Sequence, residues 1–125
     1  MKKLLLIFTL LFSSPSYADW TKVSETENTT YYLDFDNIKK KDGYVYFWKL
    51  SNYLKPDEWK DMSNKTLMEA DCNIPMKARK IYATYHSQPM GNGEPSTISP
   101  KKRDWEHTVP NTAIESMLNI ICSPY

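Results

Sequence analysis

Hydrophobic and polar positions alternate over most of the chain, with the period of two that is typical of β-strands. Alternating segments at residues 20–24 and 30–33 predict one pair of strands, and segments at 63–72 and 78–86 predict a second pair. Between the pairs, residues 44–54 are almost continuously apolar and aromatic, which indicates a longer strand covered on both faces. Short polar turns join these segments, so their order predicts an antiparallel meander.

The connecting segments are rich in residues that favour turns. Residues 34–43 are expected to form a helical turn or loop, and they end in an Asp-Gly pair that favours a tight hairpin. Residues 87–104 contain three prolines and two glycines and predict a long exposed loop. Within and after this loop, one edge strand is expected near residues 96–99, and residues 105–109 could close the sheet.

The spacing of apolar residues becomes that of a helix near the C-terminus. Thr112 and Glu115 have the spacing of a capping box, in which Thr112 caps the first turn and Glu115 reaches back. The apolar stripe that should face the sheet consists of Ala113, Ile114, Met117, Leu118, Ile121 and Cys122. The predicted fold class is therefore α+β, an antiparallel sheet of about six strands with a C-terminal helix packed on it.

Residues 1–18 have the pattern of a secretory signal peptide. Two lysines precede an apolar run over residues 4–12, and small residues precede an expected cleavage after Ala18. An N-terminal core helix is the alternative, but the Ser-Pro break suits export better and the run is too short to span a bilayer. No cysteine stands at the expected cleavage site, so we expect one exported domain over residues 19–125 without a lipid anchor.

The two cysteines, Cys72 and Cys122, are expected to form a disulfide, since an exported chain meets an oxidising compartment. A metal site with two thiolates and a redox pair are the alternatives. The metal would need further ligands, and His86 and His107 are the histidines available. No C-x-x-C spacing favours redox catalysis. A disulfide here would tie the predicted helix to the sheet.

Composition and charge make several function classes improbable. The 125 residues contain 16 Lys and Arg against 15 Asp and Glu, which gives no global reason to expect nucleic acid or an anionic membrane as partner. No Gly-rich tract is present to bind phosphate. The carboxylates lack a catalytic spacing and no nucleophile motif accompanies a histidine, so we expect no enzyme, metal or cofactor. His86 and His107 could hold a metal or haem only if the fold brought them together.

Aromatic and basic side chains are the candidates for binding. Most of the aromatic residues between positions 44 and 53 should build the core, but any left exposed would suit a protein contact. Two basic runs, at residues 39–41 and 101–103, are expected in loops, where they are either only solvated or face an acidic partner such as a sulfated polymer. The predicted binding residues are Tyr46, Trp48, Lys101, Lys102 and Arg103.

A series of short motifs runs through the chain in a defined order. They are Trp20 with Val23, Tyr31-Tyr-Leu-Asp34, Ile38, Gly43 to Trp48-x-Leu50, Asn52-Tyr53, Asp71-Cys72, Arg79, Tyr85 to Met90-Gly-x-Gly93, Trp105, Val109-Pro110 and Cys122. In these motifs the chain resembles the surface-adhesin protein E family over essentially the whole expected domain, including both cysteines.

This resemblance implies an antiparallel sheet of about six strands whose C-terminal helix is tied to it by the disulfide. Named members of the family are outer-membrane lipoproteins of Gram-negative bacteria that bind host matrix proteins such as vitronectin and laminin, which implies a non-enzymatic protein-binding role. This chain lacks the cysteine that anchors those members, so we expect the periplasm rather than the cell surface. A periplasmic partner or a small ligand is then the alternative, and an unpaired sheet edge would allow a homodimer.

Overall fold

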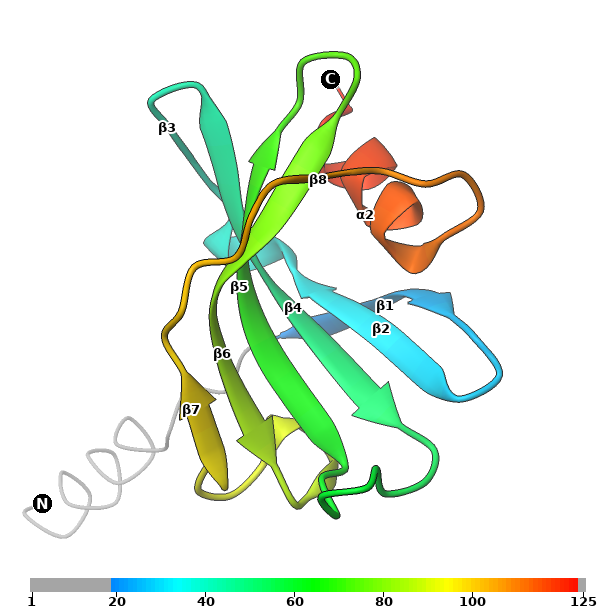
Figure 1. Cartoon of the computed structure of the whole chain (residues 1–125). Helices are drawn as coiled ribbons and strands as arrows, with labels where there is room; N and C mark the ends of the chain where they lie inside the picture. The colour runs from blue at the N-terminus through cyan, green and yellow to red at the C-terminus, as the bar shows by residue number, and fades with distance from the viewer. Residues whose placement is uncertain (1–18, 124–125) are drawn as a thin grey trace, which may run out of the picture.

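One antiparallel sheet and one helix make up the part of the chain that the computed structural model describes, residues 19–123 (Figure 1). The expected signal peptide lies outside these residues. The strands follow the order β1-β2-β4-β5-β6-β7, with β3 beside β4 and β8 beside β6. Their bounds are β1 Trp20–Glu25, β2 Thr29–Asp34, β3 Lys39–Lys41, β4 Tyr44–Tyr53, β5 Ser63–Asp71, β6 Lys77–His86, β7 Thr97–Ser99 and β8 Glu106–His107.

The antiparallel meander predicted from the sequence is confirmed, and it includes the edge strand β7 and the closing strand β8. The connection between β2 and β4 differs from the expectation, because it contains a strand. After the short turn η1 (Phe35–Asn37), the basic run 39–41 forms β3 and pairs with the start of β4. Asp42 and Gly43 join the two strands with φ angles of 54° and 85°, as a tight hairpin turn requires.

The hydrophobic core lies between the helix α2 (Ala113–Ile121) and one side of the sheet, which we call the helix face (Figure 1). The apolar stripe of α2 points at the sheet, as its spacing predicts. The buried core residues are Leu33, Val45, Phe47, Met68, Ala70, Ala78, Met117, Leu118 and Ile121. No helix in residues 19–123 is long and apolar enough to cross a membrane.

The start of α2 confirms the predicted cap. The Thr112 hydroxyl accepts a hydrogen bond from the Glu115 N–H at 3.3 Å. The Glu115 carboxylate reaches back one residue further than expected, where it accepts from the Asn111 N–H at 3.1 Å. Both contacts satisfy N–H groups at the helix start that have no partner within the helix.

The long strand β4 is covered by the helix on one face only, so the prediction of two covered faces is wrong over its first half. Val45 and Phe47 point to the helix face and are buried. Tyr44, Tyr46 and Trp48 point to the opposite side and stay partly exposed. Phe47 is therefore the only buried aromatic residue of β4, and the expectation that most of them build the core is also wrong.

The opposite side of the sheet is closed at the end of β4. Leu50 is fully buried there, because the turn η2 (Pro89–Gly91) packs against β4 and β5. The Gly91 N–H donates to the buried Ser63 hydroxyl at 2.8 Å. With a φ of 67°, and with Lys65 only 2.9 Å from where a Cβ would lie, position 91 needs glycine for this close approach.

The Cys72–Cys122 disulfide is present, with an S–S distance of 2.06 Å. Cys122 follows the last residue of α2, as the helical stripe predicts. Cys72 lies one residue beyond the end of β5 rather than within the strand. The bond therefore connects the C-terminal end of the helix to the end of a central strand, which fixes where the helix lies on the sheet.

Removing this disulfide should destabilise the domain strongly. The two cysteines are 50 residues apart, and closing a loop of that length in the unfolded chain is worth about 4 kcal/mol in the chain-entropy model. We expect a Cys72→Ser, Cys122→Ser double variant, and the reduced native chain, to show a much lower Tm by circular dichroism. An unchanged melting curve would contradict the role assigned to this bond.

Candidate functional site

The side of the sheet opposite the helix, which we call the open face, brings together aromatic side chains from two strands, β4 and β6. Directly opposite residues in neighbouring strands share a face. The register pairs Trp48 with Leu67, and Leu67 with Tyr82. The rings of Trp48 and Tyr82 meet edge-on, with their centroids 6.2 Å apart. The residues of the open face are Tyr44, Tyr46, Trp48, Leu67, Glu69, Arg79 and Tyr82.

Glu69 is a buried carboxylate that organises one end of the open face. It accepts hydrogen bonds from the Tyr46 hydroxyl and from Arg79 Nε, the latter at 2.6 Å. Burial alone would raise the pKa of Glu69, but these hydrogen bonds and the Arg79 charge outweigh it, so the pKa lies below its ordinary value. The same hydrogen bond raises the pKa of Tyr46. Glu69 therefore stays ionised and holds two open-face side chains in place.

Trp105 covers this end of the open face from the segment between β7 and β8. Its ring centroid lies 4.3 Å from Arg79 Cζ and 5.0 Å from Lys77 Nζ. The Tyr44 ring is 5.4 Å away, centroid to centroid. Cations over an indole face are attracted to it, so these contacts bind the segment to the sheet. The chain is thus packed against the sheet at Trp105, directly after the predicted long loop.

Basic residues flank the open face on both sides. Lys39 and Lys41 lie opposite two tyrosines of β4 and share their face. On the other side, Lys102 is close enough for its charge to help lower the pKa of Glu69. A hollow of about 750 Å³ lies between β3 and the middle of the sheet, and Tyr46 and Trp48 are among the residues that line it.

The structure distributes the five predicted binding residues over both sides of the sheet. Tyr46 and Trp48 lie on the open face, and Lys102 lies near it. Arg103 instead lines a cavity on the helix face, and Lys101 is exposed to solvent. The basic run therefore does not act as one patch. Sequence reasoning missed Arg79, Tyr82 and Trp105 as members of the site, because only strand pairing brings them to Trp48 and Glu69.

The two histidines lie near opposite ends of β6. His86 ends the strand and is buried, with Thr84 Oγ1 2.9 Å and the Gly93 carbonyl oxygen 3.1 Å from its ring nitrogens. Burial lowers the pKa of this imidazole. His107 pairs with Lys77, the first residue of β6, so about 30 Å of strand separates the histidines. They cannot share a metal or haem iron, and residues 19–123 contain no cluster of three His, Cys, Asp or Glu side chains placed to hold a metal.

Comparison with known protein families assigns the fold to a family. The family model described as surface-adhesin protein E matches residues 20–123, which is nearly all of the described chain. This chain belongs to the surface-adhesin protein E family. The resemblance inferred from the short motifs is therefore confirmed. No curated protein matches the sequence.

Solved structures of Haemophilus influenzae protein E have the same fold as this family member. The selenomethionine form is 18% identical with a TM-score of 0.64, over 90% of this chain and 92% of that chain. Crystal form II is 18% identical with a TM-score of 0.62, over 88% and 91% of the two chains. At this level of identity the similarity establishes the architecture, including the sheet and the C-terminal helix.

Replacing Glu69 should change how the family domain responds to acid. Because the folded pKa of Glu69 is depressed, its stabilisation is complete above the ordinary pKa of a glutamate and is lost as the pH falls through the folded value. Glu69→Gln should cost about 2 kcal/mol at pH 7, since the charged hydrogen bond to Arg79 is lost. The variant should also lose less stability than the native chain between about pH 5 and pH 3. Urea unfolding across this range would measure both effects, and parallel pH profiles would contradict the assignment.

Proposed function

We propose that this member of the surface-adhesin protein E family is an exported, non-enzymatic binding domain whose open face contacts a protein. The supporting observation is the position of Tyr46, Trp48 and Tyr82, which lie partly exposed on the face without a helix. Partly exposed Tyr and Trp residues are enriched at the centres of protein interfaces. Lysines on both sides of these rings favour a partner with acidic side chains.

The open face is prepared for binding by contacts within the sheet. Glu69 holds the Tyr46 hydroxyl and the Arg79 guanidinium, and Tyr82 supports the Trp48 ring. Side chains that are already fixed lose little conformational entropy when a partner binds. The aromatic centre can thus contribute contact area at low entropic cost, while the flanking lysines contribute attraction at long range.

A matrix protein is the first candidate partner, because the family is that of surface adhesins. A periplasmic envelope protein is the second, and it corresponds to the location expected from the sequence. Removal of residues 1–18 during export, the resulting location and a possible homodimer remain part of this proposal.

Trp48→Ala should weaken binding to immobilised vitronectin or laminin about thirtyfold, since a central Trp typically contributes about 2 kcal/mol to an interface. The matched control is Trp59→Ala, because Trp59 is 74% exposed at the tip of the β4–β5 loop. Surface plasmon resonance of the purified domain would measure both. If Trp59→Ala reduced affinity and Trp48→Ala did not, the open face would not be the binding surface.

The basic flanks should act through charge. Lys41→Glu together with Lys102→Glu should slow association and reduce the dependence of affinity on salt, because attraction between exposed charges is screened. Lys55→Glu, in the exposed β4–β5 loop, is the matched control and should change neither. If both variants slowed association and reduced the salt dependence equally, the effect would come from net charge rather than from the open face.

Protease treatment of intact cells separates the two partner classes. Cleavage of the domain on intact cells would place it on the surface and favour a matrix protein. Protection that ends when the outer membrane is opened would place it in the periplasm, and would exclude contact with a host matrix in that state.

A further inference from the structure

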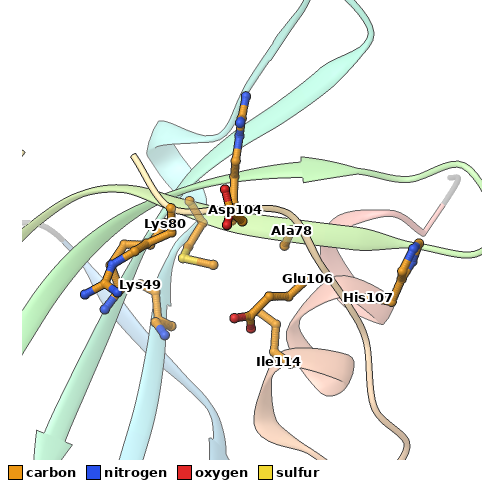
Figure 2. Close-up of a pocket in the computed structure, with 10 residues that line it drawn as sticks. Lys49, Ala78, Lys80, Asp104, Glu106, His107 and Ile114 are labelled. Atoms are coloured by element: carbon orange, nitrogen blue, oxygen red, sulfur yellow. The ribbon is translucent and has the colours of Figure 1, made fainter. Parts of the chain in front are cut away.

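A cavity of about 350 Å³ opens on the helix face, where α2 stops covering the sheet (Figure 2). Arg79 is the one open-face residue that also lines it, and the proposed protein contact does not use the cavity. Side chains from β4, β5, β6, β8, α2 and the segment before β8 line it. Volumes of this order are at the small end of the range for sites that bind small molecules.

Lys49 is the central polar group of this cavity. It follows Phe47 by two residues on β4, so it points to the helix face, and Figure 2 shows it directed into the cavity. The ion pairs between described residues are Lys22–Glu25 and Arg79–Glu69, so Lys49 has no carboxylate within 4.0 Å. Its Nζ lies over the Tyr31 ring, 5.9 Å from the ring centroid. A partly buried ammonium group without an anion is costly unless a ligand supplies one.

A second lysine reaches the same cavity because of a bulge in the sheet. The register between β5 and β6 shifts at Leu67 and Met68, and Ile81 is the extra residue. The shift turns Lys80 to the helix face, beside Met68, instead of leaving it with Tyr82 on the open face. Burial and the charge of Lys80 together lower the pKa of Lys49 to about 8. Two ammonium groups thus face one cavity and raise the potential inside it.

The walls of the cavity are apolar next to these charges. Met68 and Ala78 are 6% and 4% exposed, and Ile114 closes the side formed by α2. Apolar surface of this kind binds a hydrocarbon group by removing it from water. The site therefore offers a cationic point and an apolar wall within one enclosure.

Acidic side chains reduce the positive charge of the cavity and so limit the negative charge of a ligand that fits it. Figure 2 shows Glu106 pointing toward Lys49 from the opposite wall, and Asp104 lies at the rim. Arg79 also lines the cavity, but its charge is neutralised by Glu69. The other charged and titratable groups that line the cavity are Lys80, Arg103, Asp104, Glu106 and His107, and the Tyr31 ring lies near Lys49. Lys80 also donates a hydrogen bond to the Tyr85 hydroxyl at 3.5 Å. Lys49, Lys80 and Arg103 carry three positive charges, and Asp104 and Glu106 carry two negative charges. The excess of one positive charge matches a ligand with a single negative charge.

We propose that this cavity binds a small organic anion that has one carboxylate and an apolar body. The carboxylate takes the place between Lys49 and Lys80, and the apolar body lies against Met68, Ala78 and Ile114. Glu106 competes with the ligand for the Lys49 ammonium group. Binding is strongest while Lys49 is protonated, and it weakens as the pH rises through the pKa of that group.

Octanoate is a suitable probe, with acetate and octanamide as controls that lack the apolar body and the charge. Nuclear magnetic resonance titration of the native domain at pH 6.5 should show saturable shifts at Lys49, Met68 and Ala78. Both controls should bind at least about tenfold more weakly, since each loses one of the two contacts. Raising the pH to 9.5 should weaken octanoate binding by about tenfold. Equal binding of octanamide, or no saturation by octanoate, would overturn the proposal.

Variants separate the site from a general effect of charge. Lys49→Met keeps the length of the side chain and should weaken octanoate binding about tenfold or more. It should not lower the Tm at pH 7, because the folded state no longer holds a desolvated ammonium group. Lys39→Met, on the exposed strand β3, should leave binding unchanged, and Glu106→Gln should tighten it. Unchanged binding in Lys49→Met, or weaker binding in Glu106→Gln, would contradict the assignment.

Discussion

The structure depends on one constraint, which is that a single short helix must close a sheet much larger than itself. The helix α2 has 9 residues and is about 14 Å long, whereas β4 and β6 have 10 residues each and extend about 33 Å. The helix can therefore cover only part of one face. The disulfide at its C-terminal end holds it at one end of the sheet, and the core forms there.

The rest of the sheet is stabilised by polar and aromatic contacts instead of a second apolar layer. At one end of the open face, Arg79 is held between Glu69 and the Trp105 ring. At the other end, η2 packs on the sheet and His86 is buried in its hydrogen bonds. Between these ends, Trp48 and Tyr82 remain accessible. The proposed binding surface is thus the part of the sheet that neither closure covers.

The same constraint explains the cavity on the helix face. Beyond α2, the inward positions of the strands include polar and charged side chains, and Lys49 and Lys80 take the places that core residues would occupy. At the edge of the area that α2 covers, apolar core residues lie next to these charged side chains. Both proposed sites therefore arise from the size of the helix and not from any additional domain.

Sequence patterns predicted much of this architecture because alternation, caps and cysteines are local signals. The meander, the Thr112 cap and the Cys72–Cys122 pair follow from such signals. The strand formed by residues 39–41 could not be predicted, since three consecutive lysines show no alternation.

Which side chains lie on each face of the sheet was harder to predict than where the strands and the helix lie in the sequence. The bulge at Ile81 reverses which side chains share a face, and periodicity within β6 alone does not show it. The exposure of Trp48 depends on how far the helix reaches, which is a property of the whole fold. For these reasons Tyr46 and Trp48 were identified as candidates, while Tyr82, Trp105 and Lys49 were not.

The most direct test is site-specific photocrosslinking in the native cells, which needs no assumption about the partner. A benzophenone amino acid would replace Trp48 on the open face, Trp59 at the loop tip or Ile120 on the exposed side of α2. The account predicts a discrete crosslinked protein adduct from position 48 and none from positions 59 and 120. An adduct from position 59 or 120, with none from position 48, would contradict the claim that the open face is the binding surface.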